Sequence, residues 1–432
     1  MGPALTIVSL FVVGAAVWLV WRGVDVRLVL LGAGLVLGSL ALKPWLVLDA
    51  FMRTMGDEKI VAPICSAMGF AFVLRHTRSD RELVRLLVKP IRKVRWLLVP
   101  GGCVVGFVTN MAITSQTASA AAVGPILMPI MLAAGWHPIV IAATLVLGCS
   151  AGGNLFNPGD PDIVTVQSAT GAPLITVLDR VLLPELAGFA VAVVAFTVFS
   201  RFTPQETVTV PHEIDVADDA PIRFDKALLP LLPIALLLLL QPRLGLVPPL
   251  LRLYPDGLPV SHAMIFSMLI AMLIHRRELS AQARAFFEGM GFAYVHVISL
   301  IITASCLITG MEAVGLVDKL VSVVSGAGLF AKLLSGLIPW SLAVLSGSGT
   351  APSVAFSKAV LPSLSAVDVL EAVDIGLLGA IGATFGRTMS PVAAVVIFTS
   401  ALVGCTPLQI VKRTGPPLAF GFVAALFVVA MR

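Results

Sequence analysis

The sequence predicts an all-α polytopic membrane protein with two inverted-topology repeats of five transmembrane helices, each with a re-entrant hairpin and a broken helix. Three observations support this fold. The 432 residues are 58% hydrophobic and only 12% charged, a balance that soluble globular domains do not carry. Apolar stretches recur near the roughly 20 residues that a helix needs to cross a bilayer. The two halves of the chain also share short sequence patterns at a nearly constant separation.

The first half of the chain is expected to supply the spans of the first repeat. Apolar runs at 4–21, 26–42 and about 57–74 come first, a further helix begins at about Pro138, and a last span lies at about 173–200. The first run, Ala4 to Trp21, is long enough to span and has no positively charged region before it, so we interpret it as a first transmembrane helix and not as a cleaved signal.

Two irregular stretches interrupt these spans. The apolar segment at about 96–134 contains the polar run Thr114–Ser119, and the helix that begins near Pro138 is interrupted by Gly152–Asp162. Lipid offers no water to free backbone groups, so irregular backbone at membrane depth must lie inside the protein. We therefore predict a re-entrant hairpin that enters from the cytoplasmic side, followed by a broken helix.

The second half repeats this order. It contains a hairpin at about 333–363, expected on the outer side, whose tip carries Ser346, Gly347, Ser348, Gly349 and Thr350. Its spans are predicted at 227–240, 259–274, about 285–311, about 368–398 (a broken helix) and about 415–431.

An acid-rich linker divides the chain at its midpoint. We assign 1–200 to the first repeat, 201–226 to a cytoplasmic acidic linker and 227–432 to the second repeat. The shared patterns support this division: Thr117-Ala118 recurs as Thr350-Ala351, 233 positions on. Because five spans per half is an odd number, the second repeat must be inverted relative to the first, as in many secondary transporters.

Basic residues set the expected orientation. The segment from Arg75 to Arg95 holds eight lysines and arginines against two acids. The positive-inside rule places such a segment in the cytoplasm. Counting spans from it puts the N- and C-termini outside, and we interpret the segment itself as a solvated loop.

Arg387 is the leading candidate for a substrate-binding residue. It lies in the run Gly382–Pro391, deep in an otherwise uncharged stretch. An arginine at membrane depth needs a compensating partner, and its planar fork suits a carboxylate. The alternative is a structural ion pair with Asp160 or Asp162.

The remaining candidates are polar residues of the hairpin tips and of the two helix breaks. Hydroxyls and free backbone groups there can hold an anion, and unwound carbonyls can ligate a cation; the same hydroxyls could instead cap the broken backbone. The substrate-binding candidates are Arg387, Thr350, Ser348, Gly349, Gly347, Ser115, Gln116, Thr117, Asn154, Asn157, Thr388 and Ser390.

A coupling ion or proton is expected near Asp160 or Asp162, with Thr114 and Ser346 as further candidates. The two aspartates could instead be solvated at the outer end of a short half-helix. Sodium and the proton are the candidate coupling ions, and no other cofactor or metal is expected because the five cysteines are scattered. Lys358 is expected to reach the outer membrane interface.

Three motifs resemble the DcuC family of anaerobic four-carbon dicarboxylate carriers, within the wider ion-transporter superfamily. They are GSGTAP (Gly347–Pro352), GRTMSPVAAVV (Gly386–Val396) and PLQIVKRT (Pro407–Thr414). The resemblance implies fumarate, succinate, malate or a similar substrate. It also implies facing hairpins and a homodimer whose mobile transport domain slides against a fixed scaffold.

The hairpin tips depart from the superfamily pattern. Related members carry Ser-Asn-Thr at each tip, whereas this chain has SQT (Ser115–Thr117) and SGT (Ser348–Thr350). Proton coupling and dicarboxylate exchange therefore stay open beside sodium coupling.

The sequence thus predicts a secondary active transporter for small dicarboxylates, working by an elevator-type mechanism in the bacterial inner membrane. The alternatives are a carrier of another organic anion (a monocarboxylate, citrate-like or amino-acid conjugate) and a sodium/proton antiporter, for which Asp160 or Asp162 would be indispensable. An intramembrane enzyme is not expected, because no Ser/Lys, Asp/Asp or HExxH constellation occurs on the spans. The basic residues serve topology, so no nucleic-acid partner is expected.

Overall fold

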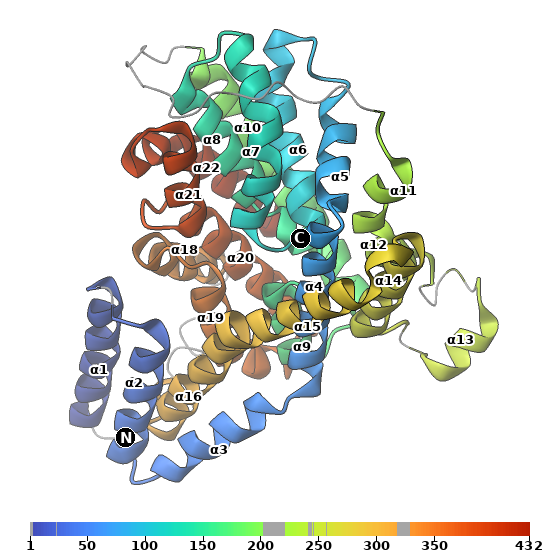
Figure 1. Ribbon diagram of the computed structural model, residues 1–432. Helices are drawn as coiled ribbons and strands as arrows, with labels where there is room; N and C mark the ends of the chain where they lie inside the picture. Colours follow the sequence, from blue (N-terminus) through green and yellow to red (C-terminus); the bar gives the residue numbers. More distant parts are fainter. Residues whose placement is uncertain are drawn as a thin grey trace.

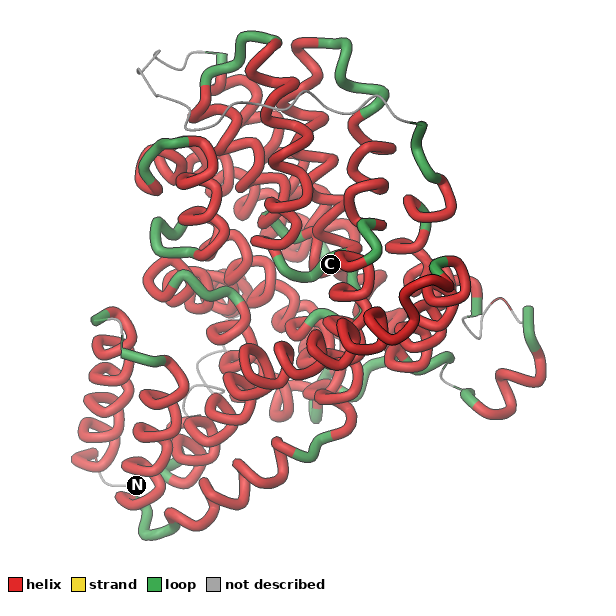
Figure 2. Tube along the Cα trace, in the orientation of Figure 1, coloured by secondary structure: helices red, strands yellow, loops and turns green. Residues whose placement is uncertain are grey.

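The computed structural model describes residues 3–22, 24–201, 221–240, 244, 246–255, 257–317 and 329–432. Within these ranges every regular element is a helix, as Figures 1 and 2 show, which confirms the predicted all-α class. Most of the acidic linker at 201–226 lies outside the described residues.

The helices of the first half are α1 (Pro3–Trp21), α2 (Val26–Leu40), α3 (Pro44–Met55), α4 (Glu58–His76), α5 (Ser79–Val88), α6 (Leu98–Ala112), α7 (Gln116–Ala133), α8 (Pro138–Ser150), α9 (Pro161–Thr170) and α10 (Leu174–Ser200). Those of the second half are α11 (Phe224–Ala227), α12 (Leu232–Leu239), α13 (Pro248–Leu253), α14 (Val260–Ile274), α15 (Leu279–Ala293), α16 (Ser299–Ala313), α18 (Leu329–Ser346), α19 (Thr350–Ser365), α20 (Val369–Thr388), α21 (Ala394–Val403) and α22 (Pro407–Ala430). Short 3-10 turns include η2 (Gly153–Phe156), and one turn of π-helix, η6 (Tyr294–Ile298), joins α15 to α16.

Seven helical segments in the described part of the chain are long and apolar enough to cross a membrane, by length and composition. The protein is therefore a multi-pass membrane protein. Five further apolar helices have 10–17 residues, and the count of ten spans stays a prediction. The segments differ in environment. In the most apolar 18-residue stretch of Pro138–Thr170, 94% of the residues are buried, whereas in that of Pro407–Ala430 only 39% are. The interrupted segment is thus enclosed by protein, as its free backbone groups require.

Each half of the chain contains one helical hairpin and one interrupted helix. Helices α6 and α7 form a helical hairpin whose turn is 113–115, and α18 and α19 form a second hairpin whose turn is 347–349. Each hairpin is followed by an interrupted helix: α8, η2 and α9 in the first half, and α20 and α21 in the second. Both breaks fall where the sequence predicts them.

The basic segment from Arg75 to Arg95 is not simply a solvated loop, which corrects our interpretation. Much of it forms α5, and Leu83, Val84 and Val88 on one face of that helix are buried. This face packs against α6 and α7 of the first hairpin. The apolar residues recur at helical spacing, a pattern that the many charges of the segment obscure.

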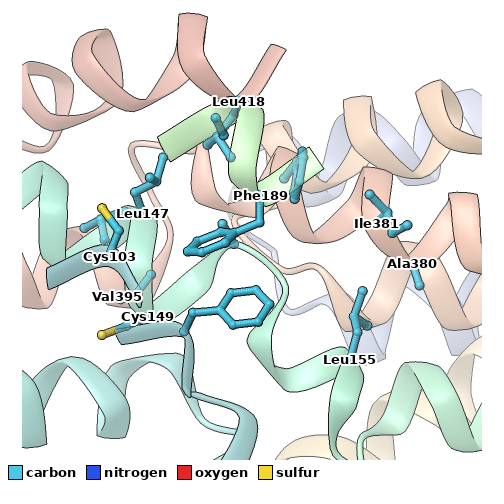
Figure 3. Close-up of a cluster of buried hydrophobic side chains, with 14 of the residues drawn as sticks. Cys103, Leu147, Cys149, Leu155, Phe189, Ala380, Ile381, Val395 and Leu418 are labelled. Carbon is cyan, nitrogen blue, oxygen red and sulfur yellow. The ribbon is translucent and has the colours of Figure 1, made fainter. Parts of the chain in front are cut away.

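The hairpins and interrupted helices share one hydrophobic core. Helix α10 packs along α22, α18 along α20, and α6 along α8. Figure 3 shows Leu147, Phe189, Ile381 and Leu418, from four different helices, in this core. In Figure 1, α15 and α16 form a long diagonal arm below it, beside α1, α2 and α3. The two hairpins and the two interrupted helices are therefore packed together around this core.

Helix bounds recur between the halves at a nearly constant offset. Helix α21 begins and ends 233 residues after α9, and α14 begins and ends 234 residues after α2. Both α9 and α21 end at a glycine in the left-handed conformation, Gly171 with φ +68° and Gly404 with φ +78°. Such a cap satisfies the last carbonyls of a helix and stops it. Both halves thus use the same stop signal at corresponding places.

Glycines bring α10 and α22 into close contact. A Cβ at Gly421 would lie 2.5 Å from the carbonyl oxygen of Gly188, and a Cβ at Gly188 would lie 2.9 Å from that of Gly421. These two glycines are themselves 233 positions apart in the sequence. Small residues of this kind allow membrane helices to pack backbone against backbone.

Replacing Gly421 with alanine is therefore expected to separate α10 from α22 and to destabilise the protein by about 1–3 kcal/mol. The matched control is Gly291→Ala on α15, where a Cβ would meet no atom within 4 Å. Thermal unfolding in detergent should show a lower Tm for Gly421→Ala and an unchanged or higher Tm for Gly291→Ala. Equal Tm values for the two variants would contradict the close contact.

Candidate functional site

Hydrogen bonds join the tip of the first hairpin, between α6 and α7, to the helix break that follows α8. The buried amide of Asn110 accepts a hydrogen bond from the backbone N–H of Asn154 at 3.0 Å and donates to the carbonyl of Ile113 at 3.0 Å. Asn157 donates to the carbonyl of Met111 at 2.9 Å. Two predicted residues, Asn154 and Asn157, therefore serve first to join hairpin and break.

The tip of the second hairpin also meets its own break, but by close approach at glycines. A Cβ at Gly347 would lie 2.9 Å from the carbonyl of Val392, in the loop between α20 and α21. A Cβ at Gly349 would lie 3.0 Å from Nη1 of Arg387. The missing side chain at Gly349 thus gives the guanidinium direct access to the tip backbone.

Arg387 lies between the two breaks, near the C-terminus of α20. Its side chain is buried, with 6% of the residue exposed, and its Nη2 donates to the carbonyl of Ser150 at 3.2 Å. The hydroxyl of Thr388 donates to the same carbonyl at 2.9 Å. Because Ser150 ends α8, its carbonyl has no partner within that helix and is free to accept these bonds.

The alternative of a structural ion pair between Arg387 and Asp160 or Asp162 is not seen in the described structure. None of the carboxylates lies within 4 Å of the guanidinium, although Asp160, Asp162 and Glu185 are all close enough to attract it. Its Nε has no hydrogen-bond partner. Donors of the guanidinium are therefore left available for an anion.

Asp160 and Asp162 begin α9 and have different surroundings. Asp160 caps the helix by accepting from the backbone N–H of Asp162 at 3.0 Å, and its other oxygen accepts from Asn154 at 2.9 Å. Both oxygens of Asp162 lack a hydrogen-bond partner, although the hydroxyl of Ser353 on α19 lies nearby. Both aspartates are at most 2% exposed, so the alternative that they are solvated is wrong.

Glu185 is a site residue that the sequence reasoning missed. It lies at the middle of α10, is 0% exposed, and neither of its carboxylate oxygens has a hydrogen-bond partner. The carboxylate fills the space beside Gly152, where any Cβ would overlap it. An acid in the middle of a 27-residue apolar helix, beyond Asp179 and Arg180 nearer its start, was a signal that could have identified it.

Asn110, Ser150 and Ser353 were also missed. Each is a small polar residue within or at the end of a predicted membrane helix. Asn110 contacts the first tip and the break after it, whereas Ser150 and Ser353 contact residues of the other half of the chain. No regular spacing in the sequence indicates such contacts.

The site holds a single arginine among three carboxylates. Charges at this depth are costly unless paired. If all four groups were ionised, the cluster would carry two net negative charges, before any anionic substrate is bound. The cluster therefore places more acidic than basic groups around the guanidinium.

The other tip residues divide into two groups. Some cap local backbone: Ser115 accepts from the N–H of Ala118 at 3.4 Å, Ser346 donates to the carbonyl of Leu342 at 2.8 Å, and Gln116 donates to the carbonyl of Thr114 at 3.1 Å. The second group has hydroxyls for which the described structure shows no hydrogen bond: Thr114, Thr117, Ser348, Thr350 and the buried Ser390.

Lys358 makes a hydrogen bond within the protein, and its extension to the outer membrane interface stays a prediction. Its ammonium donates to the hydroxyl of Ser305 at 2.7 Å, which links α19 to α16. The bond lies at a cavity of about 220 Å³ that Thr165, Ser168 and Asp57 also line. The described residues contain no group of three or more His, Cys, Asp or Glu side chains that could hold a metal ion.

Comparison with known proteins assigns this chain to a family. The model of the DcuC family, described as C4-dicarboxylate anaerobic carrier, matches residues 50–432. An uncharacterized transporter of Haemophilus influenzae is 38% identical over 133 residues, covering 31% of this chain and 92% of that protein. The anaerobic C4-dicarboxylate transporter DcuC of Escherichia coli K12 is 24% identical, covering 83% of this chain and 77% of that protein.

A solved structure also shares the fold. The structure of Neisseria gonorrhoeae MtrF, described in its title as illuminating a class of antimetabolite efflux pumps, aligns with a TM-score of 0.60 at 14% sequence identity. The alignment covers 89% of this chain and 83% of MtrF. At this identity the likeness concerns the fold alone.

Replacing Asn110 with alanine is expected to leave the buried N–H of Asn154 unpaired and to destabilise the protein by about 1–3 kcal/mol. Gln116→Ala is the control, because that half-buried amide bonds only within the turn. The Tm of the Asn110 variant in detergent should fall well below that of the Gln116 variant. A similar Tm for both would show that Asn110 does not join the hairpin to the break.

Proposed function

Because the chain belongs to the DcuC family of C4-dicarboxylate anaerobic carriers, we propose that it is a secondary active transporter for small dicarboxylates such as fumarate, succinate or malate. The observation that carries this proposal is Arg387, a buried arginine whose guanidinium has donors to spare and no ion pair within 4 Å in the described structure. A buried charge without a partner is costly. A substrate carboxylate would supply that partner.

Arg387 would bind one carboxylate of the substrate through the two parallel hydrogen bonds that its planar fork favours. The second carboxylate would be held by hydroxyls of the tips, for which Thr117, Ser348 and Thr350 are available. Gly349 supports this arrangement, because the absence of a side chain lets the substrate and the guanidinium approach the tip backbone.

We include the two inverted repeats and the re-entrant hairpins in the proposal. Element contacts support them, because they come in corresponding pairs: α2 packs on α16 and α14 on α4, while α3 packs on α16 and α15 on α4. The counterparts in the two halves are α2 and α14, α3 and α15, and α4 and α16. Replacing each helix by its counterpart turns the contact of α2 with α16 into that of α14 with α4, and likewise for the other two contacts. Gly188 and Gly421 touch each other at corresponding positions, as residues beside a two-fold axis do.

Transport would proceed by an elevator-type movement of the hairpins and interrupted helices against α1–α4 and α12–α16. An apolar cavity of about 340 Å³ supports this division, since it separates α1, α2 and α16 from the second hairpin. The carrier would be a homodimer in the bacterial inner membrane. The basic segment from Arg75 to Arg95 supports termini on the outside.

The charges around Arg387 support coupling to sodium or protons as part of the proposal. Three buried carboxylates and a dianionic substrate exceed what one guanidinium can balance, so co-transport of a cation would lower the cost of loading the site. A carrier for another organic anion would share this requirement. A sodium/proton antiporter would instead depend on Asp160 or Asp162 and tolerate loss of Arg387.

We expect Arg387→Ala to lower kcat/KM for radiolabelled succinate uptake into proteoliposomes at least about 100-fold, because two charge-assisted hydrogen bonds are lost. Arg387→Lys should recover part of the rate. Lys412→Ala, an exposed cation on α22, is the control and should transport normally.

Competition identifies the substrate class in the same assay. Excess unlabelled fumarate or malate should block succinate uptake, whereas butyrate, which has one carboxylate, should not. Wild-type succinate uptake that persists in Arg387→Ala would contradict the site. Blockade by butyrate would favour a carrier of monocarboxylates.

A further inference from the structure

We propose that Glu185 is the group that takes up and releases the coupling proton, an inference that rests on the proposed transport of dicarboxylates. Helix α10, which carries Glu185, passes beside the first helix break. There the carboxylate lies against Gly152, whose φ of +93° and missing side chain leave room for it.

The surroundings of Glu185 require it to be neutral when the site is closed. It is 0% exposed, and neither oxygen accepts a hydrogen bond from any described residue. An ionised carboxylate without water or donors is strongly disfavoured in such a place, whereas a protonated one is tolerated. The position therefore holds a proton whenever water is excluded.

Asp160 and Asp162 are better suited to remain ionised. Both lie at the N-terminus of α9, where the free N–H groups and the helix dipole favour a negative charge. Asp160 also accepts two hydrogen bonds. Glu185 is in the middle of a helix, where neither form of stabilisation exists. Of the three carboxylates, Glu185 is therefore the one for which protonation costs least.

The charged groups that face Glu185 are few. Helix α20 contributes Arg387, which attracts the carboxylate from beyond ion-pair distance. Helix α9, which also packs against α10, carries Asp162 at its start. Helix α6 and the turn η2 contain no charged residue. On α20, Asp374 is paired with Arg180 of α10. The charged residues at 412, 413 and 432 lie toward the ends of α22, away from Gly421, which meets α10 beside Glu185.

This arrangement links the proton to the substrate through Arg387. A substrate carboxylate on the guanidinium would cancel the positive charge that favours ionised Glu185, so the dianion and the proton would each strengthen binding of the other. On release, Arg387 would again favour the carboxylate, and the proton would leave to water on that side. The structure points to a proton and not sodium at Glu185, because the described residues show no group of three or more acidic, histidine or cysteine side chains that could hold an ion there.

The test is radiolabelled succinate transport in proteoliposomes that are more acidic outside than inside by one pH unit. Wild type should accumulate succinate, up to about tenfold for one coupled proton. Glu185→Gln mimics the neutral acid and should lose this accumulation while retaining succinate counterflow, because exchange does not require proton release. The control Glu288→Gln, an exposed acid on α15, should behave as wild type.

Two further measurements guard against a folding defect. Glu185→Gln should unfold at the same or a higher Tm than wild type at pH 8, whereas a structural anion at this position predicts a lower Tm. Glu185→Asp keeps a titratable carboxyl group and should retain a response to the pH gradient.

Three results would overturn the inference while leaving the proposed function intact. They are accumulation by Glu185→Gln equal to wild type, wild-type uptake driven by sodium but not by the pH gradient, and loss of counterflow together with accumulation in Glu185→Gln. Absence of both uptake and counterflow in wild type would instead overturn the proposed function, and this inference with it.

Discussion

The structure depends on one constraint: free backbone groups and charges at membrane depth must be enclosed by protein. Arg387 is an example of this constraint. Its guanidinium donates a hydrogen bond to the carbonyl of Ser150, which is unpaired within α8 because that helix ends there. A break in the first half of the chain thus provides a hydrogen-bond acceptor for a charged side chain of the second half. Each feature would be costly alone, and together they form a polar centre inside an apolar protein.

Close packing around this centre is achieved with small residues. Gly188 and Gly421 bring α10 and α22 together, and Gly152 leaves the space that Glu185 fills. Membrane helices gain little from hydrophobic burial against one another, so backbone proximity and buried hydrogen bonds must hold them. The same glycines therefore support both the fold and the site.

Much of the fold could be predicted from the sequence, because hydrophobic length and helix-breaking residues act locally. The hairpin turns and both helix breaks were located in this way. Helix α5 was not, since its charges masked a buried face that includes Leu83 and Val84. Of the site, Arg387 stood out by its charge, whereas the role that we propose for Glu185 depends on its contact with Gly152 and on the charge of Arg387, which the sequence does not show. Contacts across more than 200 positions, such as that of Ser150 with Arg387, leave no local pattern in one sequence.

The central claim is that Arg387 binds a carboxylate of the substrate between the two helix breaks. A structure determined with succinate bound tests it most directly. The account predicts one succinate carboxylate at about 2.7–2.9 Å from the guanidinium nitrogens, with the other beside the hairpin tips. Succinate bound elsewhere, with Arg387 paired to Asp162, would contradict it.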